Sequence, residues 1–266
     1  MKLLFTILLL FICELYVHAQ IPPFLNENQF RASINLVDDF MARFNGNKDR
    51  QGINKKDKNY EINKILFLFN GKMFKSYEDS LFIEAQKFSD FIAKNKIKIL
   101  YSDTTWFAKA KCHGNFAGKE VEFLLYLSVE KRREQMYKWV ITKAVGDIFK
   151  LKPTHHATKA MLMPDDHETN FMSLNRITTE KDDYITYYAN KNFHVDETSI
   201  FFALVYNGLL DIEYVSDLQF VFFQVPGYIF SIKYFERETD NSGWLINSLE
   251  KVSDREKENK LNYIFN

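Results

Sequence analysis

The stretch Y-I-F-S-I-K-Y-F-E-R-E-T-D-N-S-G-W-L-I (228–246) determines the fold class that this sequence predicts. Its first part is rich in aromatic and β-branched residues, which favour a β-strand. D-N-S-G (240–243) has the residues of a tight turn. We therefore expect the charged residues before this turn to lie at a solvated hairpin tip, and Trp244 to open a second strand.

The same arrangement occurs earlier in the chain, at 121–141. There V-E-F-L-L-Y-L-S-V is followed by the charged loop E-K-R-R-E-Q and by a strand that carries Trp139. Another strand precedes it, because apolar and lysine side chains alternate between Trp106 and Cys112. H-G-N-F-A-G (113–118) joins these two strands. The sequence thus predicts antiparallel strands connected by hairpins.

Helical periodicity precedes each group of strands. In the first half, apolar residues recur every three or four positions over 28–45 and 60–70, and again from Ser76 or Tyr77 onward. The second half is expected to repeat this order, with helices at 168–177, 181–190 and 197–207, and strands at 212–225, 228–237 and 243–251. The prediction is an α+β protein with an internal duplication. The alternative is one continuous α+β domain with a larger sheet.

Helices followed by long antiparallel strands around an aromatic interior resemble the NTF2-like, or cystatin-like, cone fold. The resemblance rests on element order and on aromatic-rich strands, with no diagnostic motif. It implies two tandem cone modules, at 20–149 and 167–253. Pro153 and Pro164 mark a linker at 150–166 between them. A charged tail follows at 254–266; it is interpreted as a solvated helix end, with docking of its last apolar residues on a core or on another subunit as the alternative. The family includes ligand binders, a few isomerases and dehydratases, and many interaction modules, so the fold alone does not choose a function.

The first residues predict export. Lys2 precedes an apolar run, Leu3 to Cys13, that suits a signal peptide and is too short to span a bilayer. Val17-His18-Ala19 suits cleavage before Gln20. Residues 1–19 are therefore interpreted as a signal peptide, and the mature chain, without a transmembrane segment, is expected in the periplasm or outside the cell. Lipoprotein anchoring through Cys13 is less favoured, because bulky residues precede that cysteine.

Charge and cysteine content exclude some partners and restraints. The chain has 35 Lys and Arg against 35 Asp and Glu, and removing residues 1–19 keeps this balance. Since no basic excess exists to neutralise phosphates, nucleic acid is not expected as a partner. Cys112 is then the only cysteine left, so no intramolecular disulfide is expected. With 46% hydrophobic residues and 26 Phe, the chain has to rely on core burial.

Metal binding and nucleophilic catalysis find little support in the sequence. His155, His156 and His167 lie near acidic residues, but their spacing matches no metal-binding motif. They are weak metal candidates; the alternative is a polar linker whose aspartates cap the next helix. Cys112 and His113 are adjacent in a strand, so their side chains should point to opposite faces, with Cys112 a buried structural thiol. No cofactor is predicted.

One carboxylate and four aromatic residues remain as candidate site residues. Glu122 is a weak catalytic candidate, because a carboxyl on the concave face of a cone would be desolvated and its pKa raised toward neutrality. A solvated strand carboxylate is the alternative. Trp106, Tyr126, Trp139 and Trp244 can line a pocket and stack on an apolar or sugar-like ligand. Core packing explains the same rings, because burying one of them stabilises a fold by roughly 1.5–3 kcal/mol.

Three functions are compatible with these patterns. The first is an exported, non-enzymatic protein that binds a small apolar or sugar-like ligand, or a partner protein, on the concave sheet face or in the groove between modules. The second is an isomerase- or hydrolase-like cone enzyme that uses a strand carboxylate. The third is a structural cell-envelope component with filled cores. An open apolar cavity, with or without a buried ionisable group in it, distinguishes the three.

Overall fold

The computed structural model describes residues 37–48, 55–133, 136–150, 190, 192–238 and 241–265. The predicted signal peptide (1–19) lies outside the described residues. So do almost all of the predicted linker at 150–166 and of the two short helices predicted at 168–177 and 181–190.

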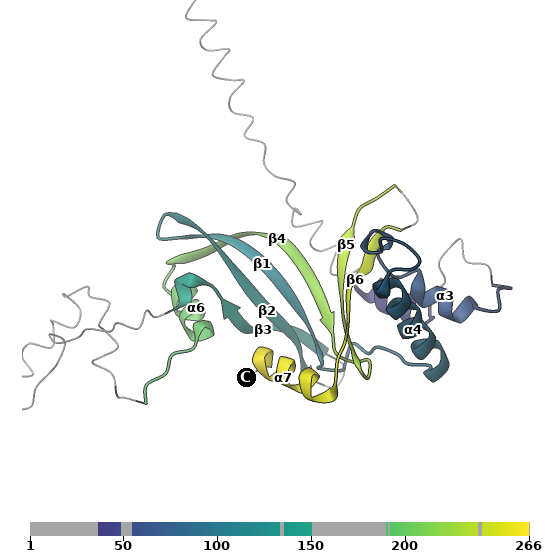
Figure 1. Cartoon of the computed structure of the whole chain (residues 1–266). Helices are drawn as coiled ribbons and strands as arrows, with labels where there is room; N and C mark the ends of the chain where they lie inside the picture. Colours follow the sequence, from purple (N-terminus) through teal and green to yellow (C-terminus); the bar gives the residue numbers. More distant parts are fainter. Residues whose placement is uncertain are drawn as a thin grey trace, which may run out of the picture.

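The described residues form an α+β fold on one antiparallel sheet, as the sequence predicted (Figure 1). The strands are β1 (Trp106–Phe116), β2 (Lys119–Arg133), β3 (Met136–Val145), β4 (Leu210–Phe222), β5 (Tyr228–Phe235) and β6 (Gly243–Lys251). Their order in the sheet is β3-β2-β1-β4-β5-β6. All the predicted strands are therefore present. The β1–β2 hairpin turns at Ala117 and Gly118, which both have the positive φ that a two-residue hairpin turn requires.

The two halves of the chain share this sheet, because β1 pairs with β4 along its length. The strands thus form the single larger sheet of the alternative interpretation, and two tandem cones are not confirmed. Register shifts near Cys112 and Gly114 bring the two backbones close together. A Cβ atom at Gly114 would lie 2.2 Å from the carbonyl oxygen of Asp211, so only glycine fits at this position.

Helices cover the sheet, and two of them begin at aspartate caps. They are α3 (Tyr60–Leu66), α4 (Ser80–Asn95), α6 (Glu197–Tyr206) and α7 (Asp254–Phe265), with residues 37–44 also helical and short 3-10 turns at Gly71–Met73 and Asp147–Phe149. The Asp79 carboxylate accepts a hydrogen bond from the Leu81 N–H at 3.0 Å, and Asp196 accepts one from the Ser199 N–H at 2.9 Å. Because 76–79 form the capping turn, α4 begins later than the sequence predicted.

Each half of the chain covers the strands of the other half. In α4, the Phe88 ring lies 5.1 Å from the Tyr228 ring and 5.6 Å from the Phe230 ring of β5. In α6, which belongs to the second half, the Phe201 ring lies 6.1 Å from the Phe123 ring of β2. Figure 1 shows α3 and α4 beside β5 and β6, and α6 at the other end of the molecule beside β2 and β3.

The sheet has a core on each face. The larger core lies under the helices at 37–44, α3, α4 and α6, and is built mainly from aromatic rings. The smaller core, on the opposite face, lies under α7, where Ile264 is buried against Phe107 and Phe223. The charged tail predicted at 254–266 is therefore a helix. Of the two dockings left open for its apolar residues, the structure has the one on the protein's own core, through Leu261, Ile264 and Phe265, while Tyr263 is exposed.

A short segment after α3 covers the edge of the sheet at β6. The Ile246 N–H donates to the Leu68 carbonyl at 2.7 Å, and the Asn70 N–H donates to the Ile246 carbonyl at 2.9 Å. Phe69 thereby forms a parallel bridge with Ile246. This pairing protects an otherwise open sheet edge and fixes the segment that follows α3 beside the β5–β6 hairpin.

Candidate functional site

The three tryptophans pack around one phenylalanine in the main core. The Phe220 ring lies 6.1 Å from Trp106, 6.0 Å from Trp139 and 4.9 Å from Trp244. Trp106 and Trp244 are fully buried, and Trp106 also stacks on Phe222 at 5.4 Å. Trp139 is half-buried at the edge of this group. Other side chains of the core therefore cover the tryptophan rings that the sequence suggested for a ligand.

Tyr126 lies apart from the tryptophans, on the opposite face of the sheet. Its ring packs against Phe107 at 5.7 Å, and the Lys109 ammonium lies 5.9 Å from its centre. Burial raises the pKa of the Tyr126 phenol. The four aromatic candidates are thus divided between the two cores, and no single site contains them all.

Glu122 is exposed rather than desolvated. Its side chain is 53% exposed, and the carboxylate lies 2.8 Å from the Lys111 ammonium and 3.4 Å from His113 Nε2. The Lys111 ammonium holds the pKa of Glu122 below its usual value. The expectation that the pKa of Glu122 is raised is therefore wrong. The carboxylate is exposed to solvent, and Lys111 of the neighbouring strand lies beside it.

Cys112 and His113 lie on opposite faces of β1, as predicted. Cys112 is buried in the main core, and burial raises the pKa of its thiol to about 11. His113 stacks on Tyr214 at 4.5 Å, and its Nε2 lies 2.8 Å from the Ser216 hydroxyl. The thiol and the imidazole therefore cannot act as a nucleophile and its base.

The metal candidates His155, His156 and His167 lie outside the described residues. Among the residues that the structure describes, no group of three or more His, Cys, Asp or Glu side chains is arranged to hold a metal ion.

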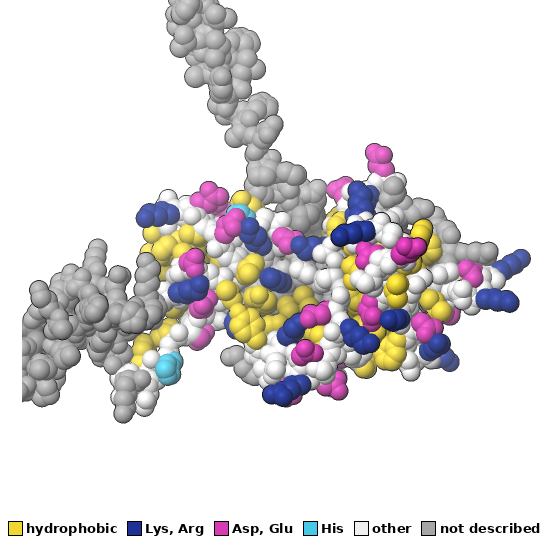
Figure 2. All heavy atoms as spheres, viewed as in Figure 1, with side chains coloured by type: hydrophobic (Ala, Val, Ile, Leu, Met, Phe, Trp, Pro, Cys, Tyr) yellow, Lys and Arg dark blue, Asp and Glu magenta, His cyan; other side chains and the backbone are white. Residues whose placement is uncertain are grey.

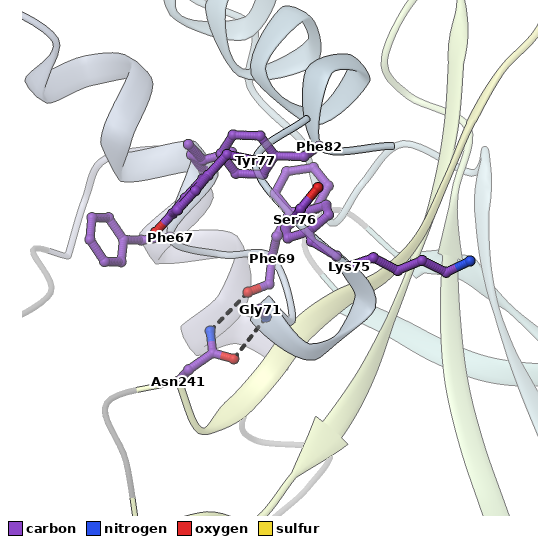
Figure 3. Close-up of a pocket in the computed structure, with 10 residues that line it drawn as sticks. Phe67, Phe69, Gly71, Lys75, Ser76, Tyr77, Phe82 and Asn241 are labelled. Carbon is purple, nitrogen blue, oxygen red and sulfur yellow. Dashed lines mark hydrogen bonds between the residues drawn. The ribbon is translucent and has the colours of Figure 1, made fainter. Parts of the chain in front are cut away.

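An open apolar pocket lies elsewhere, beside the segment that follows α3. It has a volume of about 550 Å³. Aromatic rings from one short stretch of sequence form most of its wall: Phe67, Phe69, Phe74, Tyr77 and Phe82. Figure 3 shows these rings around the pocket, with Asn241 of the β5–β6 hairpin on the side of Gly71. At the rim, Phe67 is 50% exposed and Tyr77 is 84% exposed.

Asn241 holds the pocket segment against the sheet. Its side-chain oxygen accepts hydrogen bonds from the Gly71 N–H at 3.0 Å and from Arg237 Nη1 at 2.9 Å. Its side-chain nitrogen donates to the Phe69 carbonyl at 2.8 Å, and Arg237 Nη2 donates to the Asn70 side chain at 2.8 Å. The charged residues at the hairpin tip were expected to be solvated, and Glu236 and Glu238 are exposed. Arg237 and Asn241 are partly buried instead, because they satisfy polar groups of the neighbouring segment.

The aromatic rings of the wall contact one another. The Phe82 ring lies edge to face on Phe74 and on Tyr77, at 5.2 Å from each, and the Phe69 ring is tilted against Phe74 at 5.9 Å. These contacts restrain the rings that form the wall. Among the described wall residues Lys75 supplies the only ammonium group, and its side chain extends away from the rings (Figure 3). The pocket therefore suits an uncharged apolar group.

Sequence reasoning missed this pocket, although a signal for it exists. Phe74 and Tyr77 stand in the polar stretch N-G-K-M-F-K-S-Y-E-D-S (70–80), and Phe74 lies outside both of the helical patterns that flank this stretch. Exposed aromatic side chains in such a loop indicate a binding surface more directly than aromatic residues in strands, because strand aromatics are usually core.

No helix in the described ranges is long and apolar enough to cross a membrane. Comparisons with protein-family models, with curated proteins and with solved structures each find no significant match. The geometry of the pocket therefore carries the functional inference.

Proposed function

We propose that this protein binds a small uncharged apolar ligand in the pocket between Phe67 and Phe82. The observation that carries the proposal is an open cavity of about 550 Å³ walled by five aromatic side chains. Its volume lies in the usual range for small-molecule sites, roughly 300–1,000 Å³. The proposal keeps the expected class of a non-enzymatic binding protein and moves its site from the tryptophans of the sheet to the segment after α3.

The chemistry of the wall selects an apolar ligand over a sugar. A sugar needs several hydrogen-bonding groups as well as a ring to stack on. The amide of Asn241 is already engaged by Gly71, Phe69 and Arg237, so it has little capacity left for a ligand. Ser76 supplies the remaining side-chain hydroxyl besides that of Tyr77. A ligand here gains mainly from burying apolar surface.

The alternative functions have less support. The enzyme hypothesis named Glu122, whose exposure and lowered pKa do not suit general acid/base work at neutral pH. The pocket contains no carboxylate, histidine or cysteine among its wall residues. The structural-component hypothesis expects filled cores and no pocket. The sheet interior is filled, but the cavity beside α3 is open.

Paired dyes test the proposal. We expect the neutral dye N-phenyl-1-naphthylamine to bind with a fluorescence increase, and its anionic relative 1-anilinonaphthalene-8-sulfonate to bind more weakly, because no cation faces the cavity. Tyr77→Ala should weaken binding of the neutral dye about five- to tenfold, the equivalent of roughly 1 kcal/mol for one aromatic contact.

Tyr206→Ala is the matched control, because Tyr206 is also highly exposed, at 90%, but lies on α6 away from the pocket. Equal dye binding by the wild type and Tyr77→Ala, or a loss confined to Tyr206→Ala, would refute the pocket as the binding site. Circular dichroism of each variant establishes that the fold is retained.

We also propose that the two halves are equivalent helix-plus-meander units of the NTF2-like kind, exported together. In support, β1 and β4 pair at the centre, each is followed by two strands that continue outward, and each half's helices cover the other half's strands. A two-fold axis perpendicular to the sheet, between β1 and β4, relates the two sets. Residues 1–19 support export, and amino-terminal sequencing of the mature protein would test cleavage before Gln20.

A further inference from the structure

A second exposed apolar surface lies at the other end of the molecule, on α6 and the start of β4. Phe202, Val205 and Tyr206 follow the i, i+3, i+4 spacing and so share one face of α6. They are exposed, together with neighbouring apolar side chains at Phe193, Val195, Leu209 and Ile212. Figure 2 shows hydrophobic side chains gathered at this end, with acidic side chains among them. The surface is called here the α6 face.

The α6 face carries an unbalanced negative charge. Between Asn192 and Ile232 the sequence has no Lys or Arg and five Asp or Glu, of which Asp217 is paired with Lys233 just beyond this range. Asp211 and Glu213 are exposed at the start of β4, and neither forms an ion pair with another described residue. The carboxyl-terminal end of α6 lies next to them, and the helix dipole adds partial negative charge there.

Neighbouring elements do not cancel this charge. The β1–β2 hairpin brings one base, Lys119, and one acid, Glu120, so its net contribution is zero. Glu120 and Asp211 are both paired with Asn115, one on each side of it, so these two acids lie at the same level of the sheet. At the other end of α6, Asp196 adds one exposed carboxylate, whereas Glu197 is half-buried, accepts a hydrogen bond from the Gly146 N–H and lies near Lys150.

We propose that the α6 face is a docking surface for a protein segment with an apolar ridge flanked by Lys or Arg, such as a cationic amphipathic helix. The ridge packs against Phe202 and Tyr206, and its basic side chains pair with Asp211 and Glu213 at one end of α6. Asp196, the exposed acid at the amino-terminal end, takes a basic group at the other end of the ridge.

Charge distinguishes this partner from two other occupants of an apolar face. A second copy of the chain would bring acids to acids at both ends of the helix pair, which is unfavourable. An anionic membrane surface would be repelled by the same carboxylates and would meet no lysine or arginine on α6. A protein segment with apolar and basic side chains is complementary both to the exposed apolar side chains and to the carboxylates of the α6 face.

A synthetic amphipathic helix of leucine and lysine serves as the probe, and the same peptide with every lysine replaced by glutamate is its control. Fluorescence anisotropy should show binding of the lysine peptide and not of the glutamate peptide. Binding should weaken several-fold when NaCl is raised from about 50 to about 200 mM, because exposed ion pairs are screened. Tyr206→Ser should weaken it about tenfold, whereas Tyr77→Ser, in the other apolar site, should leave it unchanged.

Asp211→Asn combined with Glu213→Gln should reduce both the affinity and its dependence on salt, which a purely apolar contact would not predict. Tyr206→Cys, in a Cys13→Ser background, should react rapidly with a thiol reagent and be protected by the lysine peptide. Slow labelling of Cys at position 206 in the free protein would show that the chain itself covers the face and would overturn the proposal.

Three other results would also overturn it: equal binding of both peptides, a dimer in analytical ultracentrifugation that Tyr206→Ser dissociates, or binding to anionic phospholipid vesicles that the same substitution removes. Each would assign the face to a different occupant.

Discussion

Tyr228 connects α4 to the sheet through its hydroxyl group as well as its ring. The phenol donates a hydrogen bond to Glu84 Oε1 at 2.9 Å, and the ring packs edge to face on Phe88. Burial, together with the Glu84 carboxylate, raises the pKa of Tyr228 to about 12. The residue is therefore held in its neutral form well beyond the range in which a free tyrosine ionises.

This pKa makes stability depend on alkaline pH. Above about pH 10 the unfolded chain loses the Tyr228 proton, whereas the folded protein keeps it until about pH 12. The unfolded state then binds fewer protons, so the free energy of unfolding falls as pH rises through this window. Tyr228→Phe removes this titration. Urea denaturation should therefore show that its free energy of unfolding falls by about 1 kcal/mol less than that of the wild type between about pH 9 and about pH 11.

At neutral pH the same substitution should cost about 1 kcal/mol, since it removes one hydrogen bond to a partly exposed carboxylate. Tyr206→Phe provides the comparison, because Tyr206 is exposed on α6 and should change neither quantity. An unaltered alkaline slope in Tyr228→Phe would contradict the assignment of the raised pKa to this residue.

For single residues, the sequence predicted which side chains are buried better than it predicted which side chains form a functional site. Alternation placed Trp106 and Cys112 on one face of a strand, and both are buried there. Alternation could not determine the environment of Glu122, because that environment depends on the partner Lys111, which comes from the neighbouring strand. Residues whose environment comes from distant segments are the ones that pattern alone does not determine.

Among the elements, the β5–β6 hairpin has a structural role that its turn sequence does not reveal. Asn241→Ala removes the bonds to the Gly71 N–H and the Phe69 carbonyl. We expect the free energy of unfolding to fall by about 1–2 kcal/mol, because the partly buried Phe69 carbonyl and the more exposed Gly71 N–H lose their partner. Dye binding at the pocket should weaken in parallel, since the segment that carries Phe69 is no longer fixed.

Asn247→Ala, on β6 beyond the hairpin, is the control for Asn241→Ala and should change stability little. Thermal unfolding and dye titration of both variants check the prediction. If Asn241→Ala unfolds at the wild-type temperature and binds dye normally, the segment after α3 is held by its backbone pairing with Ile246 alone.

The strands and the longer helices could be predicted because their signals are local. Apolar residues recur every two positions in a strand and every 3.6 positions in a helix when one face of the element is buried. The sequence of the element alone therefore shows the pattern. The start of α4 was misplaced because the apolar spacing of the helix continues into the capping turn at 76–79. The helix itself begins only after Asp79, which has an extended backbone and caps it. The pocket was missed because it forms between a loop and a hairpin that are far apart in sequence.

For the whole molecule, the exchange of helices between halves has a testable consequence. A chain ending at Lys150 lacks β5, on which Phe44 and Phe88 pack, and a chain beginning at Asn190 lacks β2, on which Phe201 packs. Neither fragment can bury its helices. We therefore expect neither to unfold cooperatively alone, because each would expose a large apolar surface.

Mixing the two fragments should restore the near-ultraviolet circular dichroism signal and a cooperative thermal transition. Doubling the concentration of either fragment alone should restore neither. A cooperative transition in the first fragment alone would show that 20–149 is an independent module after all. The order of elements predicted the repetition of the halves, but it carried no information on which helix covers which strands.

The central pairing of β1 with β4 also governs when the protein can fold. The Arg43 guanidinium donates to the Trp244 carbonyl across 201 residues of sequence, and β1 has no neighbour on one side until β4 is present. Long-range contacts of this kind slow folding, because distant segments must meet before the contacts can form. A nascent chain can pair β1, β2 and β3 locally, but the main core stays incomplete until β5 and β6 have been synthesised. Without that core the chain remains easy to unpair, and so able to be threaded through a narrow channel, for nearly the whole of its synthesis.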